Sequence, residues 1–519
     1  MEARLTASYG SSLRRLAVLP LAALAALSAA ATANAGTPAA PVPSPTTVAT
    51  TTMSNWLTDN TDPTSTDEGS LAWIEQMLHV PQAWSAGYTG TGVDVALVDS
   101  GVAPVDGLDG DNVVNGPDLS FEAGYADVAH RDTFGHGTHL ASIIAGKSAD
   151  LTGIAPGARI VSLKVATATG ATDVTQIIAA IDWVVRHAHD GGRNIRVLNL
   201  SYGTDSIQPY DVDPLSHAVE RAWQAGIVVV AAAGNEGATR QQLADPASDP
   251  YVLAVGADDT HGTLSPADDT VADFTQRGST ARQIDIVAPG LHVLGLTVPN
   301  GYVDQTHPEG KVGDRFIRGS GTSQATAVVS GVLALLAQRY PDATPDQLKY
   351  LVTSTAQQGE AGVLDAGGAL AGDPDLAPAQ TWPASTGTGS LEAARGSAHV
   401  AIGDAVLSGE QDIFGTPWTG PGSAANPAWL TLGDTGWTAS TDWTGTTWDS
   451  RTWVSRTWVA GEWDSRTWVS EDWLSRTWVS RTWVSRTWVV GDWITSNWAS
   501  ADPASSDPDS RTWAGGDWS

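Results

Sequence analysis

The chain has 519 residues, which is enough for two or three domains, and its 42% apolar content is ordinary for a globular protein. Its formal net charge of −30 excludes nucleic acids and anionic lipid surfaces as expected partners, because like charges repel. The sequence contains no cysteine, so the folded core must be stable without disulfide bonds.

The first 35 residues have the pattern of a secretory signal. The N-terminal region is basic and ends with Arg14 and Arg15. An apolar stretch follows it, and Ala33-Asn34-Ala35 then has the small-x-small pattern of a signal-peptidase site. A membrane anchor is the alternative, but the apolar stretch is short for a span. We therefore expect cleavage near Ala35 and a secreted, extracellular protein, with association to the cell surface left open. No other long apolar run occurs, so we expect no membrane span in the mature protein.

Residues 36–70 are rich in Thr, Pro, Ala and Ser and show no periodicity, which predicts a flexible segment or a short pro-segment. Residues 71–370 differ, since they contain short β-branched runs typical of strands buried on both faces. These runs are residues 93–99, 159–165, 195–201, 227–233 and 251–257.

Helical patterns alternate with these strands, at residues 173–189 and 214–226. Gly226 is placed to end the second helix, and Thr344 begins a capping box with Gln347 that predicts a further helix. Alternating strands and helices indicate an α/β fold, with a parallel sheet and helices on both of its faces.

The end of the chain has a different composition. Residues 371–436 are rich in Gly, Pro, Ser and Thr, as in a linker. Residues 437–519 form a tail in which tryptophan recurs at every fifth position from Trp443 to Trp498. Five residues advance an α-helix by about 500°, so this spacing argues against an amphipathic helix. Disorder and an irregular β structure with exposed rings both remain open.

Three short segments carry candidate catalytic residues. Asp99 follows the first strand, although an Asp there is often only a turn or capping residue. His136 is flanked by two glycines, and His139 lies three residues on, which also permits a metal site. Ser323 precedes a long apolar helical pattern, where, taken alone, it is better explained as a helix cap.

Taken together, these residues predict nucleophilic catalysis. A serine hydroxyl needs an imidazole to accept its proton, and the imidazole needs a carboxylate to orient it. Asp99, His136 and Ser323 follow one another in a chain order that is known for serine triads. Asn235 comes just after another strand, where its side-chain amide could donate a hydrogen bond to a developing oxyanion or simply form a turn.

At these segments the sequence resembles the subtilisin-like serine proteases (subtilases). The similarity covers roughly residues 73–370, and several motifs stand in the family's order. They are VALVDSGV (95–102), GHGTHLA (135–141), GIAPGARI (153–160), VLNLSYG (197–203), AAAGNEG (231–237) and GTSQATAVVSG (321–331).

The resemblance implies a subtilisin-like fold with Asp99, His136 and Ser323 as the triad, and with Asn235 and the Ser323 backbone N–H in the oxyanion hole. It further implies that Ser201, Tyr202 and Gly203 pair with an extended polypeptide substrate, while Ala231 to Gly234, including Ala232, line the pocket for the side chain before the cut.

The sequence departs from the family in two ways. Gln324 and Ala327 replace the usual Met and Pro beside the nucleophile, and the segment before residue 71 lacks a pattern for a folded propeptide. The chemistry requires no cofactor, whereas a structural calcium ion is common in the family. An acidic loop follows Asp99, which fits calcium or plain solvation, so no ligands are assigned. Its aspartates are Asp106, Asp109, Asp111 and Asp118.

These observations predict a secreted serine endopeptidase that acts through an acyl-enzyme intermediate. The alternative is a weakly active or inactive relative that acts as a surface-binding or adhesion protein through its Trp repeats. In either case, the repeats are a candidate anchor to cell-wall glycan or another insoluble polymer, since exposed rings can stack on sugar faces.

Overall fold

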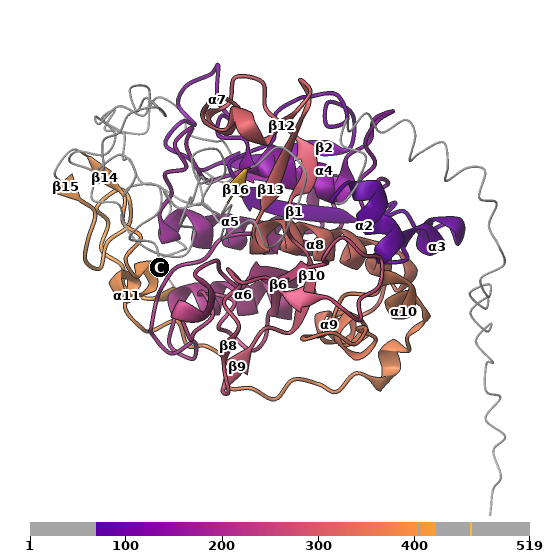
Figure 1. Ribbon diagram of the computed structural model, residues 1–519. Coiled ribbons are helices and arrows are strands. Elements are labelled where there is room, and N and C mark those ends of the chain that lie inside the picture. Colours follow the sequence, from indigo (N-terminus) through magenta and orange to yellow (C-terminus); the bar gives the residue numbers. More distant parts are fainter. Residues whose placement is uncertain (1–68, 403–404, 422–456, 459–519) are drawn as a thin grey trace, which may run out of the picture. The chain divides into compact units, whose positions relative to one another are not determined.

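The computed structural model describes residues 69–402, 405–421 and 457–458 (Figure 1). The expected signal, nearly all of the following segment and most of the Trp-rich tail therefore lie outside the described residues. In the described part, no helix is long and apolar enough to cross a bilayer.

A largely parallel sheet forms the centre of the domain, in the order β10-β6-β5-β4-β1-β3-β2, with the short strand β7 antiparallel to β6. The five strands expected from sequence are present within two residues of their predicted ends, because their β-branched runs are buried on both faces. The bounds are β1 Asp94–Asp99, β2 Val113–Asp118, β3 Arg159–Lys164, β4 Ile195–Leu200, β5 Val228–Ala232, β6 Leu253–Asp259, β7 Thr270–Val271 and β10 Ile286–Pro289.

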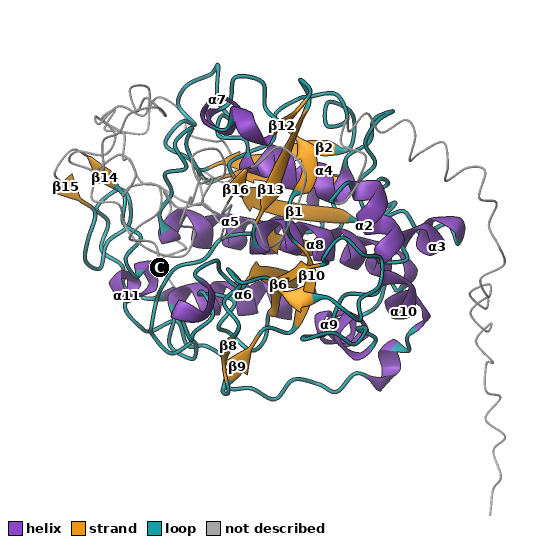
Figure 2. Ribbon diagram, in the orientation of Figure 1, coloured by secondary structure: helices purple, strands orange, loops and turns teal. Residues whose placement is uncertain are grey.

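Two pairs of helices cover this sheet: α4 packs on α8, and α5 packs on α6 (Figure 2). Strands β1 and β5 each contact a helix from both pairs, which places the pairs on opposite faces of the sheet. The expected α/β class with helices on both faces is thereby confirmed. The longer helices are α4 His136–Ala145, α5 Val174–His187, α6 Pro214–Gln224, α8 Thr322–Arg339 and α9 Pro345–Ser354.

Local capping explains where several of these helices begin. The Thr344 side chain accepts a hydrogen bond from the backbone N–H of Gln347, and the Gln347 side chain accepts one from the backbone N–H of Thr344, as the capping box predicted. Asp173 forms the same arrangement with Gln176 at the start of α5. After α6 the chain turns at Gly226, whose φ of 87° is accessible to glycine at low cost.

A second, small antiparallel sheet lies beside the start of α8, in the order β11-β13-β12. Its strand β13 (Phe316–Ser320) leads directly into α8, so it carries the chain to Ser323. One described piece of the tail, β16 (Thr457–Trp458), pairs antiparallel with Gly319 and Ser320. The other strands here are β11 Val293–Leu296 and β12 Lys311–Val312.

Short elements complete the described chain. Residues 385–418 fall inside the range expected as a linker, yet they carry buried side chains that include Leu391, Arg395 and Val400. The remaining helices are α2 Leu71–Met77, α3 Val80–Ser85, α7 Tyr302–Thr306, α10 Ala366–Ala371 and α11 Leu391–Arg395, with 3-10 turns at Asp190–Gly192, Gly237–Thr239, Pro308–Gly310 and Pro374–Leu376. The remaining strands are β8 Gly278–Ser279, β9 Arg282–Gln283, β14 Ala401–Ile402 and β15 Ala405–Val406.

Candidate active site

Asp99 and His136 meet at the carboxyl edge of the sheet. The His136 Nδ1 lies 2.9 Å and 3.0 Å from the two carboxylate oxygens of Asp99, and both side chains are fully buried. Ser100 also donates its backbone N–H to Asp99 over 2.8 Å. A carboxylate on Nδ1 fixes the imidazole tautomer in which Nε2 is the nitrogen that can accept a proton.

His136 is positioned by the way in which α4 begins. The Asp132 carboxylate accepts hydrogen bonds from the backbone N–H groups of Phe134, Gly135 and Thr138, and from the Thr138 hydroxyl, over 2.7–3.0 Å. Burial raises the pKa of Asp132, although its hydrogen bonds with Thr138 and Gly135 act the other way. These contacts fix the first turn of α4 and, with it, the imidazole that the turn carries.

Close packing against β1 also fixes this turn. A Cβ added to Gly137 would lie 2.2 Å from the carbonyl oxygen of Gly101, so no larger residue fits without a shift. The Ser100 hydroxyl accepts a hydrogen bond from the Gly137 backbone N–H at 2.9 Å. Helix α4 can therefore approach the end of β1 closely enough for His136 to reach Asp99.

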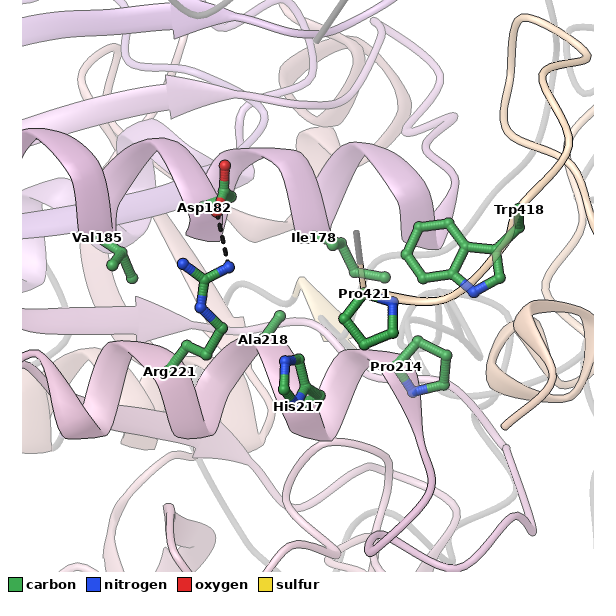
Figure 3. A pocket seen from close by; sticks show the side chains of 9 residues that line it. All are labelled: Ile178, Asp182, Val185, Pro214, His217, Ala218, Arg221, Trp418 and Pro421. Carbon is green, nitrogen blue, oxygen red and sulfur yellow. Dashed lines mark hydrogen bonds and ion pairs between the residues drawn. The ribbon is translucent and has the colours of Figure 1, made fainter. Parts of the chain in front are cut away.

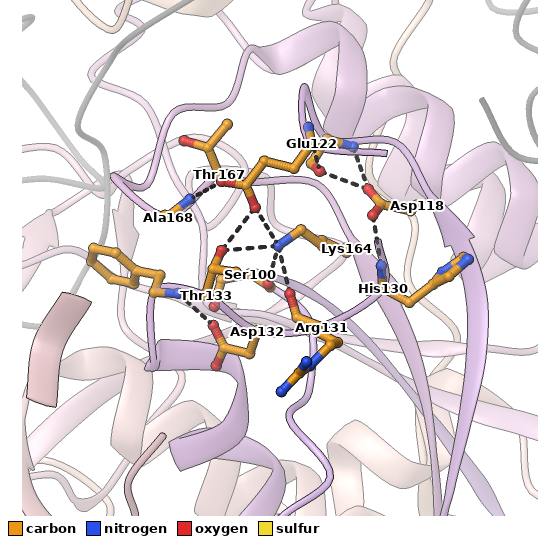
Figure 4. Close-up of polar contacts among 12 residues, drawn as sticks. Ser100, Asp118, Glu122, His130, Arg131, Asp132, Thr133, Lys164, Thr167 and Ala168 are labelled. Carbon is orange, nitrogen blue, oxygen red and sulfur yellow. Dashed lines mark hydrogen bonds and ion pairs between the residues drawn. The ribbon is translucent and has the colours of Figure 1, made fainter. Parts of the chain in front are cut away.

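A buried lysine holds the loop before α4 (Figure 4). Lys164, at the end of β3, forms an ion pair with Glu122 over 2.9 Å and donates hydrogen bonds to the Arg131 and Ser100 carbonyls over 2.6 Å and 3.3 Å. The Thr133 hydroxyl also lies 3.2 Å from Lys164 Nζ. The ammonium group thus joins the end of β1 to the loop that carries Asp132.

Ser323 stands in the first turn of α8 and is fully buried. Among the described residues its hydroxyl has no hydrogen-bond partner, while its carbonyl accepts a hydrogen bond from the Ser201 hydroxyl at 3.3 Å. The first N–H groups of a helix have no partner within the helix, so the backbone N–H of Ser323 is suited to stabilise negative charge.

Asn235 lies beside this turn, just past the end of β5. Its Oδ1 accepts hydrogen bonds from the backbone N–H and the hydroxyl of Thr322, both at 2.9 Å. Because the amide group is planar, this arrangement turns Nδ2, its only donor atom, away from Thr322. Sequence reasoning did not single out Thr322, although a hydroxyl directly before the candidate nucleophile was a usable signal.

The family model described as the subtilase family matches residues 90–370. This range contains Asp99, His136, Asn235 and Ser323 in the motifs that suggested the resemblance. The chain belongs to the subtilase family.

The curated relatives that match this chain are also named as proteases or subtilisins. This subtilase is 38% identical to serine protease AprX of Bacillus subtilis over 280 residues, which are 51% of this chain and 61% of AprX. It is 33% identical over 295 residues to the minor extracellular protease Epr of the same organism, covering 56% of this chain and 39% of Epr. For subtilisin Savinase of Lederbergia lenta, the identity is 32% over 293 residues, covering 55% of this chain and 91% of Savinase. The chain therefore spans less than two thirds of AprX and of Epr.

The residues expected to bind substrate surround the same edge of the sheet. Ser201, Tyr202 and Gly203 directly follow β4, and their side chains or backbones are buried. Ala232 ends β5, and Gly234 follows two residues later with a φ of 107°. This positive φ favours glycine at position 234, and a Cβ there would also lie 2.0 Å from the Gln276 side chain, which would have to shift.

The residues considered as metal ligands do not form one group in the fold. Among the described residues, no group of three or more His, Asp or Glu side chains is arranged to hold a metal ion. Asp106 pairs with Arg315 over 2.7 Å, whereas Asp118 accepts hydrogen bonds from Ser120 and from the backbone N–H of His130. The acidic loop thus divides its carboxylates between separate contacts.

The departures beside Ser323 leave the helix intact. Gln324 and Ala327 are both buried within α8, which continues unbroken to Arg339. The usual Pro near this position would remove a backbone donor from the first turns, so its replacement by Ala leaves one more N–H in α8.

Proposed function

We propose that this subtilase is a secreted serine endopeptidase in which Asp99, His136 and Ser323 form the catalytic triad. The main support is the buried contact between His136 Nδ1 and Asp99, 2.9 Å and 3.0 Å to the two oxygens. Helix α4, which begins at His136, packs on α8, which carries Ser323 in its first turn.

The proposed reaction begins when the Ser323 Oγ attacks the substrate carbonyl and passes its proton to His136 Nε2. Asp99 keeps the ring in the required tautomer and stabilises the imidazolium that forms. The developing oxyanion receives hydrogen bonds from Asn235 Nδ2 and from the Ser323 backbone N–H. This chemistry needs no cofactor.

The second half of the reaction reverses these proton transfers. His136 returns the proton to the leaving amine as the peptide C–N bond breaks, which leaves the acyl group as an ester on Ser323. His136 then accepts a proton from water, the resulting hydroxide attacks the ester, and the carboxylic acid leaves as the Ser323 hydroxyl is restored.

A polypeptide substrate would lie extended beside residues 201–203, which we call the substrate segment. Pairing between main chains would hold the residues before the cut in register, whatever their side chains. The apolar run that includes Ala232 and Gly234 would line the pocket for the side chain immediately before the cut. The inward orientation of the Ser201 hydroxyl, toward the Ser323 carbonyl, supports a backbone role for this segment.

Secretion and anchoring complete the proposal. A signal in residues 1–35 would direct the chain out of the cell, in keeping with the extracellular relative Epr. The Trp repeats in residues 437–519 would hold the enzyme on an insoluble polymer. N-terminal sequencing of the protein from culture medium tests the first idea, and a start upstream of residue 30 would contradict cleavage near Ala35.

The decisive experiment is Ser323→Ala. We expect this variant to fold as the wild type does and to lose casein hydrolysis almost completely, since the triad acts as a unit. A serine-directed phosphonylating reagent should label Ser323 in the wild type and leave the variant unlabelled. Casein cleavage by Ser323→Ala at the wild-type rate would show that another group is the nucleophile.

A further inference from the structure

A segment beyond the matched family region packs beside the residues that follow the proposed substrate segment. We call residues 385–402 and 405–418 the clasp. Its helix α11 lies beside α6 (Figure 1). The family model ends at residue 370, so the family match says nothing of the clasp.

A buried ion pair anchors the clasp. The Arg395 Nε lies 2.7 Å from the Asp173 carboxylate, and both side chains are fully buried. The same guanidinium donates to the Gly409 carbonyl over 2.7 Å and to the Gln411 carbonyl, so it also ties the clasp to itself. A buried charge left without its partner is strongly destabilising, so the ion pair of Arg395 with Asp173 holds the clasp in one position.

Asp173 connects this anchor to the substrate segment. It caps α5 by accepting the backbone N–H of Thr175 at 3.0 Å. Tyr202, in the middle of the substrate segment, is fully buried within electrostatic range of Asp173 and Arg395. Burial and then the Asp173 charge raise the pKa of Tyr202 well above its usual value, while Arg395 acts the other way. The charges of the anchor therefore act on the buried Tyr202 side chain.

The clasp also contacts the two residues that follow the substrate segment. The Thr204 hydroxyl donates to the Ala394 carbonyl over 2.6 Å, and the Ser397 hydroxyl donates to the Asp205 carboxylate over 2.8 Å. The backbone N–H of Ser397 donates to the same carboxylate. A Cβ on Gly396 would lie 2.1 Å from Asp205 Oδ1, so glycine permits this approach.

These two residues lead on to the proposed pocket and oxyanion hole. Thr204 exchanges backbone hydrogen bonds with Asp245 over 2.9 Å and 3.0 Å. The Asp205 carboxylate pairs with Arg240 over 3.5 Å, and Arg240 pairs with Glu236 over 3.3 Å. Glu236 directly follows Asn235, so a continuous series of contacts joins the clasp to the oxyanion donor.

The far end of the clasp reaches one end of the groove between α5 and α6 (Figure 3). Trp418 stands at one end of this groove beside Pro214, and an ion pair between Asp182 and Arg221 bridges the two helices farther along. Near the start of the clasp, the Ser385 N–H donates to both Glu220 oxygens over 2.8 Å. The clasp is thus fixed at both ends as well as at Arg395.

From these contacts we propose that the clasp is a positioning element for substrate, in which Ser397 holds Asp205, close to the substrate segment and linked to the oxyanion donor, while the ion pair of Arg395 with Asp173 keeps the clasp itself in place. This inference rests on the proposed protease function. It predicts that the clasp affects substrates that pair along the segment, and has little effect on substrates too short to do so.

The test compares two substrates, a four-residue peptide anilide and a single-residue ester. We expect Ser397→Ala to lower kcat/KM for the anilide about 5- to 10-fold, mostly through KM, which is the scale of one typical lost hydrogen bond, since the Ser397 backbone N–H still donates to Asp205. Its kcat for the anilide and its kcat/KM for the ester should stay within about twofold of wild type, because the triad itself is untouched.

Controls separate positioning from general loss of structure. Thr386→Val removes a hydroxyl of the clasp that donates to the Asp211 carbonyl over 3.1 Å, away from Thr204 and Asp205, and should leave both substrates unchanged. Arg395→Met should exceed Ser397→Ala in effect on the anilide. The kcat/KM of Arg395→Lys for the anilide should lie between those of wild type and Arg395→Met, because lysine retains the charge but lacks the planar guanidinium group.

The outcomes are distinct. A selective loss on the anilide in Ser397→Ala, with a melting temperature near that of wild type, supports the inference. Equal losses on both substrates, or no loss on either, overturn it, whatever the yield of the Arg395 variants. If the wild type cleaves neither substrate, or if Ser323→Ala cleaves both, the proposed function itself fails and the inference falls with it.

Discussion

Replacing Gly137 by alanine tests how closely His136, the proposed catalytic base, must be placed. The added Cβ would lie 2.2 Å from the Gly101 carbonyl oxygen and 3.0 Å from Asp99 Oδ1. An ordinary carbon–oxygen contact needs about 3.3 Å, so the start of α4 or the end of β1 must move by about 1 Å. His136 is the neighbouring residue, and its contact with Asp99 must change with that movement.

The expected loss follows from this displacement. A misplacement of about 1 Å at a catalytic group can cost about 10²-fold, so we expect kcat/KM on a peptide anilide to fall by about that factor. Overpacking typically costs about 1–3 kcal/mol, which is less than the stability of an average domain, so the variant should remain folded. Circular dichroism and the melting temperature establish this before the kinetics are compared.

Gly124→Ala is the matched control, because a Cβ at that exposed glycine meets no atom within 4 Å. It should retain wild-type kcat/KM and stability. If a folded Gly137→Ala variant keeps kcat/KM within about threefold of wild type, the close approach of α4 to β1 does not control the placement of His136.

Three further predictions follow. Asn235→Ala should lower kcat by about 10²–10³ with little change in KM, the range known for an oxyanion-hole donor in a related subtilisin; a change confined to KM would assign Asn235 to substrate binding instead. Burial raises the pKa of Asp269 from 3.8 to about 6, so the folded chain holds a proton that the unfolded chain loses over this window. The urea midpoint of unfolding should therefore fall as the pH rises from about 4 to 6. In Asp269→Asn the midpoint should depend less on pH over this range. If the midpoints of wild type and variant fell equally with pH, Asp269 would not be the cause. Deleting residues 437–519 should leave hydrolysis of a small soluble peptide unchanged while reducing retention on cell-wall material; equal retention on every polymer tested would refute the anchor.

Much of the fold could be predicted because its signals are local. A buried parallel strand needs β-branched apolar residues over a few positions, and the runs at residues 93–99 and 195–201 contain them. A capping box needs two residues three positions apart, and Thr344 with Gln347 supplies them. The candidate site residues could be named for the same reason, since each lies within a short motif.

Contacts that join distant parts of the chain could not be predicted. Lys164 pairs with Glu122 across a loop, and Arg395 pairs with Asp173 although 222 residues separate them. The clasp has the Gly, Ser and Thr content of a linker, yet it buries scattered apolar side chains such as Leu391 and Val400 in addition to its ion pair and hydrogen bonds. A search for apolar periodicity misses a segment whose buried apolar residues are few and irregularly spaced.

The two histidines of α4 belong to one sequence motif, and their surroundings in the fold distinguish the proposed base from its neighbour. His136 and His139 lie three positions apart, so they share one side of the helix. His136 faces the Asp99 carboxylate, which stabilises a positive charge on its ring. For His139, burial and then the neighbouring charge of His136 lower the pKa to about 3. His139 therefore stays neutral at pH values well above 3, so it would not oppose the imidazolium that the proposed reaction forms on His136. A protonated His139 would raise the energy of that intermediate, so burying it protects the proposed reaction.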